Sequence, residues 1–139
     1  MLKDQVPECA LVKQPMLDAN GDQCLVVFKN GAKTGTTIGW ANNISSYTRD
    51  YFAGQHQESR QWPVIPTDQH SGAFSAKEDS GSCIVNPFNR IGGIFTGGTS
   101  GPNAADSVDV TYATPISFIM KVHHNTKRFA HAHLNPALA

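Results

Sequence analysis

The chain has 139 residues, enough for one domain with a buried core. Lysine and arginine number 11, as do aspartate and glutamate, so the formal net charge is zero and neither a nucleic-acid footprint nor an acidic tail is indicated. The three cysteines exclude a dense disulfide framework and allow at most one bridge. No apolar run approaches the roughly 18 residues of a membrane span, and charges and proline interrupt the N-terminus before a signal peptide could form. We therefore expect a cytoplasmic protein as the chain stands, or a secreted one if an N-terminal half precedes it.

The first part of the chain shows a change of pattern near residue 22. Residues 1–21 contain two prolines and scattered charges without a sustained period, which predicts a linker or disordered N-terminal segment. Residues 24–28 are rich in β-forming side chains and predict a strand. The Asn30-Gly31 pair that follows tolerates positive φ and predicts a hairpin turn, after which residues 36–44 continue as a long strand.

Further short strands are predicted at residues 61–66, 84–85, 91–95 and 108–113, which gives about six strands separated by turn signals. This spacing is typical of an antiparallel barrel.

The chain after the last predicted strand indicates one helix and a tail. Pro115 is well placed in a first helical turn, and Ile116, Ile119, Met120 and His123 share one helical face. Residues 125–139 are polar and include His131 and His133, without a second apolar face, and we expect them to form a flexible tail.

The candidate for chemistry is Ser80, in the sequence Asp79-Ser80-Gly81-Ser82. A serine in a tight, glycine-assisted turn between an acidic residue and an apolar run can be presented as a nucleophile at the rim of a β-scaffold. Alone, the tetrapeptide is more typical of an ordinary turn, since most short clusters of Ser, Gly and Asp are turns.

Several segments around this serine occur in a recognisable order. A Lys-x-Gly-x-x-Thr-Gly-x-Thr-x-Gly sequence spans residues 29–39, a glycine-ended run Arg-Ile-Gly-Gly-Ile-Phe-Thr-Gly-Gly spans residues 90–98, and Tyr-Ala-Thr-Pro-Ile spans residues 112–116. Over roughly residues 24–122 the chain resembles the C-terminal barrel of trypsin-like (chymotrypsin-fold) serine peptidases, particularly divergent fungal and bacterial members. The resemblance implies an all-β fold in residues 22–124. The expected architecture is a six-stranded antiparallel, Greek-key-like barrel with a closing C-terminal α-helix, one half of a two-barrel peptidase.

The resemblance also implies roles for individual residues. Ser80 is the nucleophile, and the backbone N–H groups of Ser80 and Glu78 take the oxyanion-donor positions. Asp79 is the acidic residue that braces the turn. The substrate-binding edge, along which an extended peptide pairs, is formed by Thr96, Gly97 and Gly98. No cofactor or metal is implied.

Two departures from the family argue against activity in the isolated chain. Glu78 stands where the family has glycine, and keeping the same backbone geometry with a side chain costs about 1–3 kcal/mol. The family takes its histidine base and its aspartate from an N-terminal barrel, whereas no histidine precedes Cys24 here. We therefore expect a serine endopeptidase-like domain that is inactive or incomplete by itself. The alternative is a non-catalytic barrel that binds proteins or peptides.

A third hypothesis, an α/β-hydrolase, fails because Glu78 and Ser82 replace both glycines of Gly-x-Ser-x-Gly. The partners expected are a peptide or protein substrate and either a separate N-terminal barrel or a second copy of the chain, with no nucleic acid and no membrane.

The remaining histidines indicate no base and no metal site. His56 and His70 lie upstream of Ser80 in predicted loops, where a histidine is ordinarily a solvated side chain. No ligand spacing is recognisable among His123, His124, His131 and His133. Residues 43–45 form an Asn-Ile-Ser glycosylation sequon, which matters only in a secretory pathway.

Overall fold

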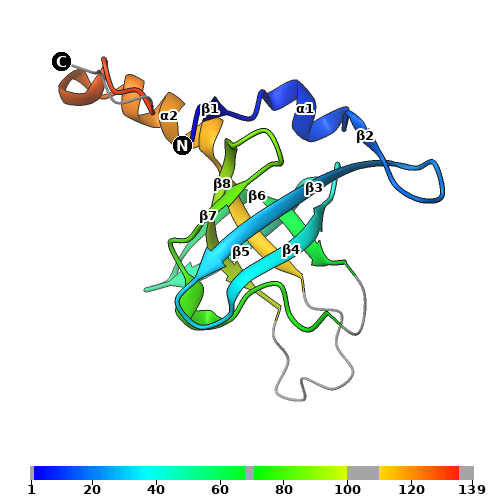
Figure 1. The fold of residues 1–139 in the computed structure, drawn as a ribbon. Coiled ribbons are helices and arrows are strands. Elements are labelled where there is room, and N and C mark those ends of the chain that lie inside the picture. The colour runs from blue at the N-terminus through cyan, green and yellow to red at the C-terminus, as the bar shows by residue number, and fades with distance from the viewer. Residues whose placement is uncertain (1, 68–70, 100–109, 135–139) are drawn as a thin grey trace.

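The structure is a computed structural model that describes residues 2–67, 71–99 and 110–134. Strands predominate over helices, so the fold is all-β, as the sequence predicted (Figure 1). Two short 3-10 turns, η1 (Lys77–Asp79) and η2 (Lys127–Phe129), accompany the regular elements. The strands and helices are β1 (Asp4–Gln5), α1 (Glu8–Val12), β2 (Met16–Leu17), β3 (Gln23–Gly31), β4 (Gly35–Ala41), β5 (Ser46–Phe52), β6 (Gln55–Pro66), β7 (Cys83–Val85), β8 (Arg90–Gly98), β9 (Thr111–Pro115) and α2 (Ile116–His124).

Six of the nine described strands pair in a circuit. The antiparallel pairs run from β3 to β4, β6, β9, β8 and β7, and β7 pairs again with β3. Each strand predicted from the sequence overlaps a member of this circuit, although β4 ends at Ala41 and not at residue 44, and β9 begins at Thr111. Residues 108–109 lie outside the described part of the chain. The other three strands, β1, β2 and β5, lie outside the circuit.

The core is formed by residues that alternate along the strands of the circuit, as expected for strands with one buried face. Leu25 and Val27 of β3 are fully buried and share the core with Trp62 and Val64 of β6. Helix α2 follows β9 directly, as predicted, and its first residue is buried. Pro115 is the N-cap, one position before the first helical turn in which it was predicted. Neither described helix has the length and apolar character needed to cross a membrane.

The N-terminal segment belongs to the folded body, so the prediction of a linker or disordered segment is wrong for residues 2–21. Strand β1 pairs in parallel with β8, and the Val6 N–H donates to the Ile91 carbonyl at 2.7 Å. Val6 and Leu11 are buried in the core cluster, and β2 pairs with β3. Two isolated apolar residues give no sequence period, and only contact with distant strands buries them.

The C-terminal segment after α2 is described as far as residue 134. It contains η2, and the His124 ring nitrogen Nε2 bonds to the Ala132 carbonyl oxygen at 2.7 Å. The rest of the predicted tail, residues 135–139, lies outside the described residues.

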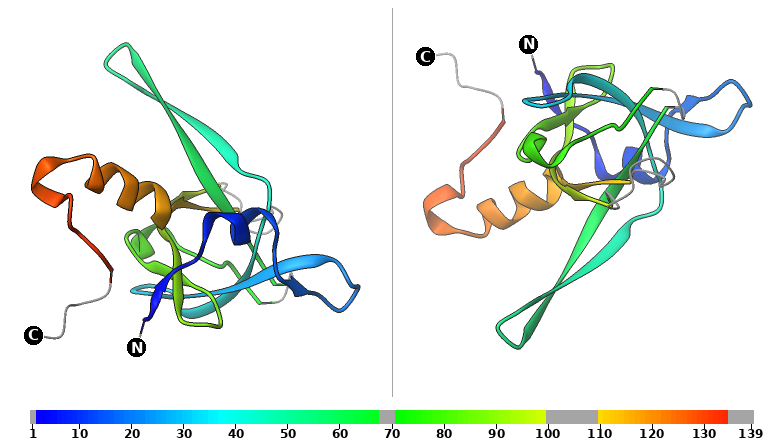
Figure 2. Two further views of the ribbon diagram at one scale, coloured as in Figure 1. Left: turned by 90° about the horizontal axis from the view of Figure 1, so that it is seen from above. Right: turned by 90° about the horizontal axis from the view of Figure 1, so that it is seen from below.

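The hairpin of β5 and β6 projects from the rest of the molecule (Figure 2). The C-terminal part of β6 pairs with β4 and β9, whereas its N-terminal part pairs with β5. Ala53 and Gly54 form the two-residue loop and have φ values of 48° and 77°, as in a type I′ turn. No strand was predicted at β5, because polar and charged residues on both faces of this hairpin interrupt any alternation of apolar side chains.

Candidate functional site

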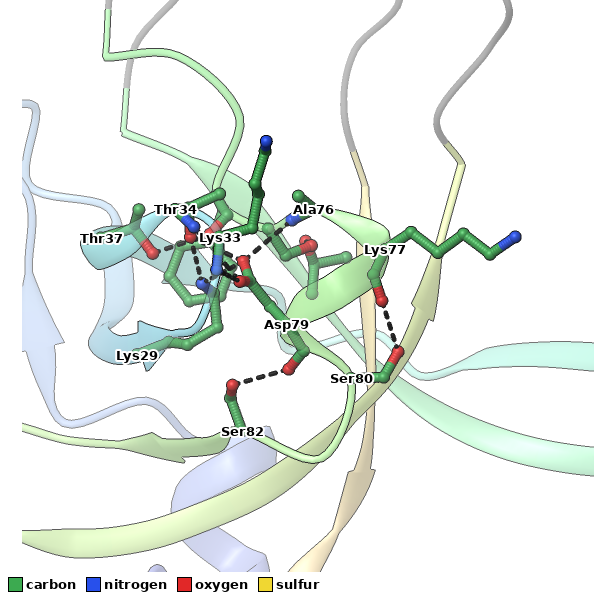
Figure 3. Close-up of polar contacts among 12 residues, drawn as sticks. Lys29, Lys33, Thr34, Thr37, Ala76, Lys77, Asp79, Ser80 and Ser82 are labelled. Atoms are coloured by element: carbon green, nitrogen blue, oxygen red, sulfur yellow. Dashed lines mark hydrogen bonds and ion pairs between the residues drawn. The ribbon is translucent and has the colours of Figure 1, made fainter.

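The residue before the candidate serine, Asp79, has a completely buried carboxylate with five donors (Figure 3). Oδ2 accepts hydrogen bonds from Lys29 Nζ at 2.9 Å, Thr34 Oγ1 at 2.6 Å and the Ala76 N–H at 3.0 Å. Oδ1 accepts from the backbone N–H groups of Lys33 at 2.7 Å and Thr34 at 3.2 Å. A buried charge is tolerated when it is paired and hydrogen-bonded in this way.

These contacts account for the Lys-x-Gly-x-x-Thr-Gly sequence. Lys29 supplies the ammonium and Thr34 the hydroxyl, while a Cβ added to Gly31 would lie 2.2 Å from Asp79 Cγ. The hairpin turn lies at residues 32–34, and the positive φ, 65°, belongs to Gly35. The turn predicted at Asn30-Gly31 therefore lies too early in the chain, because both residues still belong to β3. Gly31 leaves space for the Asp79 carboxylate and does not have a positive φ.

The environment holds the pKa of Asp79 far below its ordinary range. Burial by itself raises the pKa of a carboxyl group, but here the hydrogen bonds from Thr34 and Lys29 and from the backbone N–H groups of Ala76 and Lys33 outweigh it. Asp79 is therefore ionised throughout the physiological pH range. It serves as a fixed anion that orders the turn and cannot act as a proton acceptor there.

The exposed side chain of Ser80 directly follows this anchor. Its Oγ donates to the Lys77 carbonyl at 3.0 Å, and its N–H approaches the same oxygen at 3.4 Å. The two groups expected to act in catalysis, the nucleophilic hydroxyl and one oxyanion donor, are thus both directed at a backbone carbonyl.

Glu78 lies inside η1 with its side chain exposed. Among the described residues, positive φ at non-glycine positions occurs only at Ala53 and Asn89, so Glu78 is not strained. The strain expected at this position arises only if the backbone adopts an oxyanion-binding geometry, which differs from the 3-10 turn seen here.

The turn after Ser80 is joined to β8. Gly81 has a φ of 89°, and its N–H donates to the Phe95 carbonyl at 2.9 Å. The Phe95 N–H donates back to the Ser82 carbonyl at 2.9 Å, and Ser82 Oγ donates to the Asp79 carbonyl at 2.6 Å. These bonds hold the turn that contains Ser80 against Phe95, in the C-terminal half of β8.

The predicted substrate-binding residues follow Phe95 on β8. On one side β8 pairs with β9, with a bulge between Phe95 and Gly97. On the other side its pairing with β7 and the Ser82 backbone ends at Phe95 in the described part of the chain. Thr96, whose hydroxyl lies 3.2 Å from both Gln61 Oε1 and the Tyr112 carbonyl, begins a stretch with a free edge next to Ser80.

The histidines that the structure describes form no hydrogen bond with the serine hydroxyl. His56 belongs to β6, not to a loop as predicted, and its ring lies 6.3 Å from that of Tyr51. His123 contacts the Phe129 ring, and His70 lies outside the described residues. Within the described ranges no histidine hydrogen-bonds to Ser80, and no group of His, Cys, Asp or Glu side chains could hold a metal ion.

A groove of about 570 Å³ lies elsewhere, between α1, the base of the β5–β6 hairpin and α2. Its lining includes Leu11, Trp62 and Phe118, but none of residues 78–82. It is therefore distinct from the Ser80 turn.

No protein-family model and no curated protein matches the sequence. The sequence analysis recognised Lys29, Gly31 and Thr34 as part of a motif but did not predict that they surround the Asp79 carboxylate. Their spacing is the only signal in the sequence, and it acquires a meaning only when Asp79 lies against them.

We expect Gly81→Val to destabilise the protein by more than about 1 kcal/mol, because a β-branched residue is poorly accommodated at positive φ. Ser80→Ala, at an exposed position, should change stability by less than about 0.5 kcal/mol. Gly97→Val is a matched control, since Gly97 also has open space around an added Cβ but has no positive φ. Urea unfolding of the three variants tests this, and equal midpoints for Gly81→Val and Ser80→Ala would contradict it.

Proposed function

We propose that the circuit of six strands is the antiparallel barrel of a trypsin-like serine peptidase domain, with Ser80 at the nucleophile position. The observation that carries the proposal is the anchoring of Asp79. The residue directly before Ser80 is held by Lys29 and Thr34, two members of the segment on which the resemblance rests. A turn fixed by a buried ion pair can present the next side chain reproducibly at the barrel rim.

The chemistry of this domain is incomplete in the conformation described. Acyl transfer through serine needs a base to take the hydroxyl proton and N–H donors directed at the developing oxyanion. Here the Lys77 carbonyl engages both Ser80 Oγ and, more weakly, its N–H. Activity requires rotation of the peptide groups of η1 and a histidine brought to Ser80 by a second barrel.

We expect the isolated chain to show no meaningful peptidase turnover. A serine peptidase stripped of triad members keeps at most about 10³–10⁴ over the rate in water, and less should remain without a complete substrate cleft. A fluorophosphonate should label Ser80 no faster than an ordinary serine. Cleavage of an unstructured protein, or rapid labelling, that is lost in Ser80→Ala would contradict this expectation.

The second candidate function is a non-catalytic module that binds extended peptides along β8. Two observations favour it: among the described residues no strand pairs with β8 on the β7 side after Phe95, and the Ser80 hydroxyl donates to a backbone carbonyl.

An NMR titration with unstructured peptides tests both functions, since each predicts shifts of the Gly97 and Gly98 amides. Binding that is unaffected by Ser80→Ala, with no cleavage when a separately expressed N-terminal barrel is added, would favour the binding module. Cleavage in that mixture would favour the peptidase. Absence of shifts at these amides would count against both.

A further inference from the structure

The outer edge of β5 is open. Within the described residues β5 pairs only with β6, and the hairpin projects away from the body (Figure 2). Proteins usually protect such edges with proline, lysine or a bulge. β5 has neither residue, and its register with β6 runs without a shift from Ser46 opposite Gln61 to Phe52 opposite Gln55.

The loop geometry fixes which backbone groups face outward. In a hairpin with a two-residue loop, the pair that flanks the loop, here Phe52 and Gln55, is hydrogen-bonded. Hydrogen-bonded and non-hydrogen-bonded pairs alternate along the strands. The N–H and C=O groups of Tyr47, Arg49 and Tyr51 therefore point away from β6.

Three large aromatic side chains on this strand are exposed to water. Tyr47 and Tyr51 are each 75% exposed and Phe52 is 85% exposed. Arg49 lies between the two tyrosines on the same face and is paired with Glu58 of β6, Nε to Oε1 at 2.9 Å. A water-exposed aromatic strand with unpaired backbone groups is a surface suited to pairing with another strand.

We propose that two copies of this chain form a symmetric dimer by antiparallel pairing of β5 with β5, centred on Arg49. A two-fold axis perpendicular to a sheet places one residue opposite its own copy, as in any isologous interface. Centring on Arg49 places Tyr47 opposite the partner's Tyr51, and Tyr51 opposite the partner's Tyr47. All outward-facing groups then pair, with roughly six backbone hydrogen bonds.

Charge favours this register over the one centred on Asp50. The two Arg49 residues lie opposite each other at the centre of the interface, and each stays paired with Glu58 of its own β6. The four side chains across the dimer therefore carry two positive and two negative charges. On the other face Thr48 lies opposite the partner's Asp50, and its hydroxyl can donate to that carboxylate. Centring on Asp50 would instead bring two carboxylates together in a row whose β6 residue is Gln57, without a cation.

Sedimentation velocity at micromolar concentration tests the dimer and its register. We expect the unmodified chain to be dimeric and Tyr47→Lys/Tyr51→Lys to be monomeric, because lysine then faces lysine twice. Tyr47→Glu/Tyr51→Lys should restore the dimer, because glutamate then faces lysine. Phe118→Lys, at an exposed aromatic residue on α2, should leave the dimer unchanged. A monomeric parent chain, a dimer that survives the double lysine variant, or no recovery in the glutamate–lysine variant would each overturn the proposal.

A cross-linking experiment reports on the interface even if a double variant loses its hairpin. The exposed thiols are first removed as Cys9→Ser and Cys83→Ser. In this background Arg49→Cys should form an intermolecular disulfide in mild oxidant, since residues opposite each other in antiparallel strands lie within disulfide reach. Asp50→Cys, which faces Thr48 of the partner subunit, should cross-link far more slowly. Equal rates, or no cross-linking of Arg49→Cys, would overturn the proposed register.

Discussion

Asp79→Ala is expected to lower the free energy of unfolding by about 3–5 kcal/mol, because it leaves the Lys29 ammonium buried without its counter-ion. The substitution also removes the acceptor for Thr34 Oγ1 and for the N–H groups of Lys33 and Ala76. Urea unfolding near pH 7 measures the effect.

Two control variants show whether the loss of stability comes from the buried ion pair. Glu78→Ala removes the neighbouring, exposed carboxylate and should change stability by less than about 0.5 kcal/mol. Lys29→Met/Asp79→Asn removes both charges and should be more stable than Asp79→Ala, because no uncompensated charge stays buried. If Asp79→Ala costs no more than Glu78→Ala, the ion pair does not stabilise the fold.

The pH dependence of this contribution follows from the depressed pKa of Asp79. A group whose pKa is lower in the folded state stabilises the fold above its unfolded pKa, about 4 for aspartate, and loses that stabilisation as the pH falls below it. The stability difference between the unmodified chain and Asp79→Asn should therefore be constant from about pH 7 to about pH 5 and narrow below about pH 4.

Gly31→Ala is expected to cost at least about 2–3 kcal/mol, near the upper end of overpacking penalties. The new methyl group would lie 2.2 Å from Asp79 Cγ and would displace the carboxylate from its donors. Unfolding by denaturant, with Gly35→Ala as the control, measures this. At Gly35 there is open space around an added Cβ, and the cost is the positive φ alone, about 1 kcal/mol.

A double-mutant cycle identifies the cause of the Gly31 effect. When Asp79 is already alanine, the atoms that collide with the new methyl group are gone, so Gly31→Ala should cost much less than it does in the unmodified chain. Additive costs would show that the space beside Gly31 is unrelated to the carboxylate.

These results bear on the candidate site because the Asp79 carboxylate both stabilises the fold and holds the turn that carries Ser80. The backbone of Ser80 continues directly from a residue with five hydrogen-bond donors around its carboxylate. Loss of that anchor should release the turn, and with it the bonds that join Gly81 and Ser82 to Phe95. The position of Ser80 is thus fixed by the packed strands even though its hydroxyl faces a carbonyl.

The sequence by itself predicted the strands of the circuit and the helix α2. Each of those strands has an apolar run or alternation bounded by glycine, proline or asparagine, and Pro115 precedes a helical period. These signals are local, so they can be read without the fold. The Asp79-Ser80-Gly81 turn was recognised in the same way, and the positive φ of Gly81 agrees with it.

The tertiary structure alone decided the rest. Lys29 and Asp79 are 50 residues apart, and neither reveals its partner because lysine and aspartate are ordinarily surface residues. β5 carried no signal, since with both faces in water nothing selects an alternation of apolar and polar residues. Val6 and Leu11 are buried only because β8 and the core lie beneath them. The direction of the Ser80 N–H depends on the η1 backbone, which residue types around a turn do not specify.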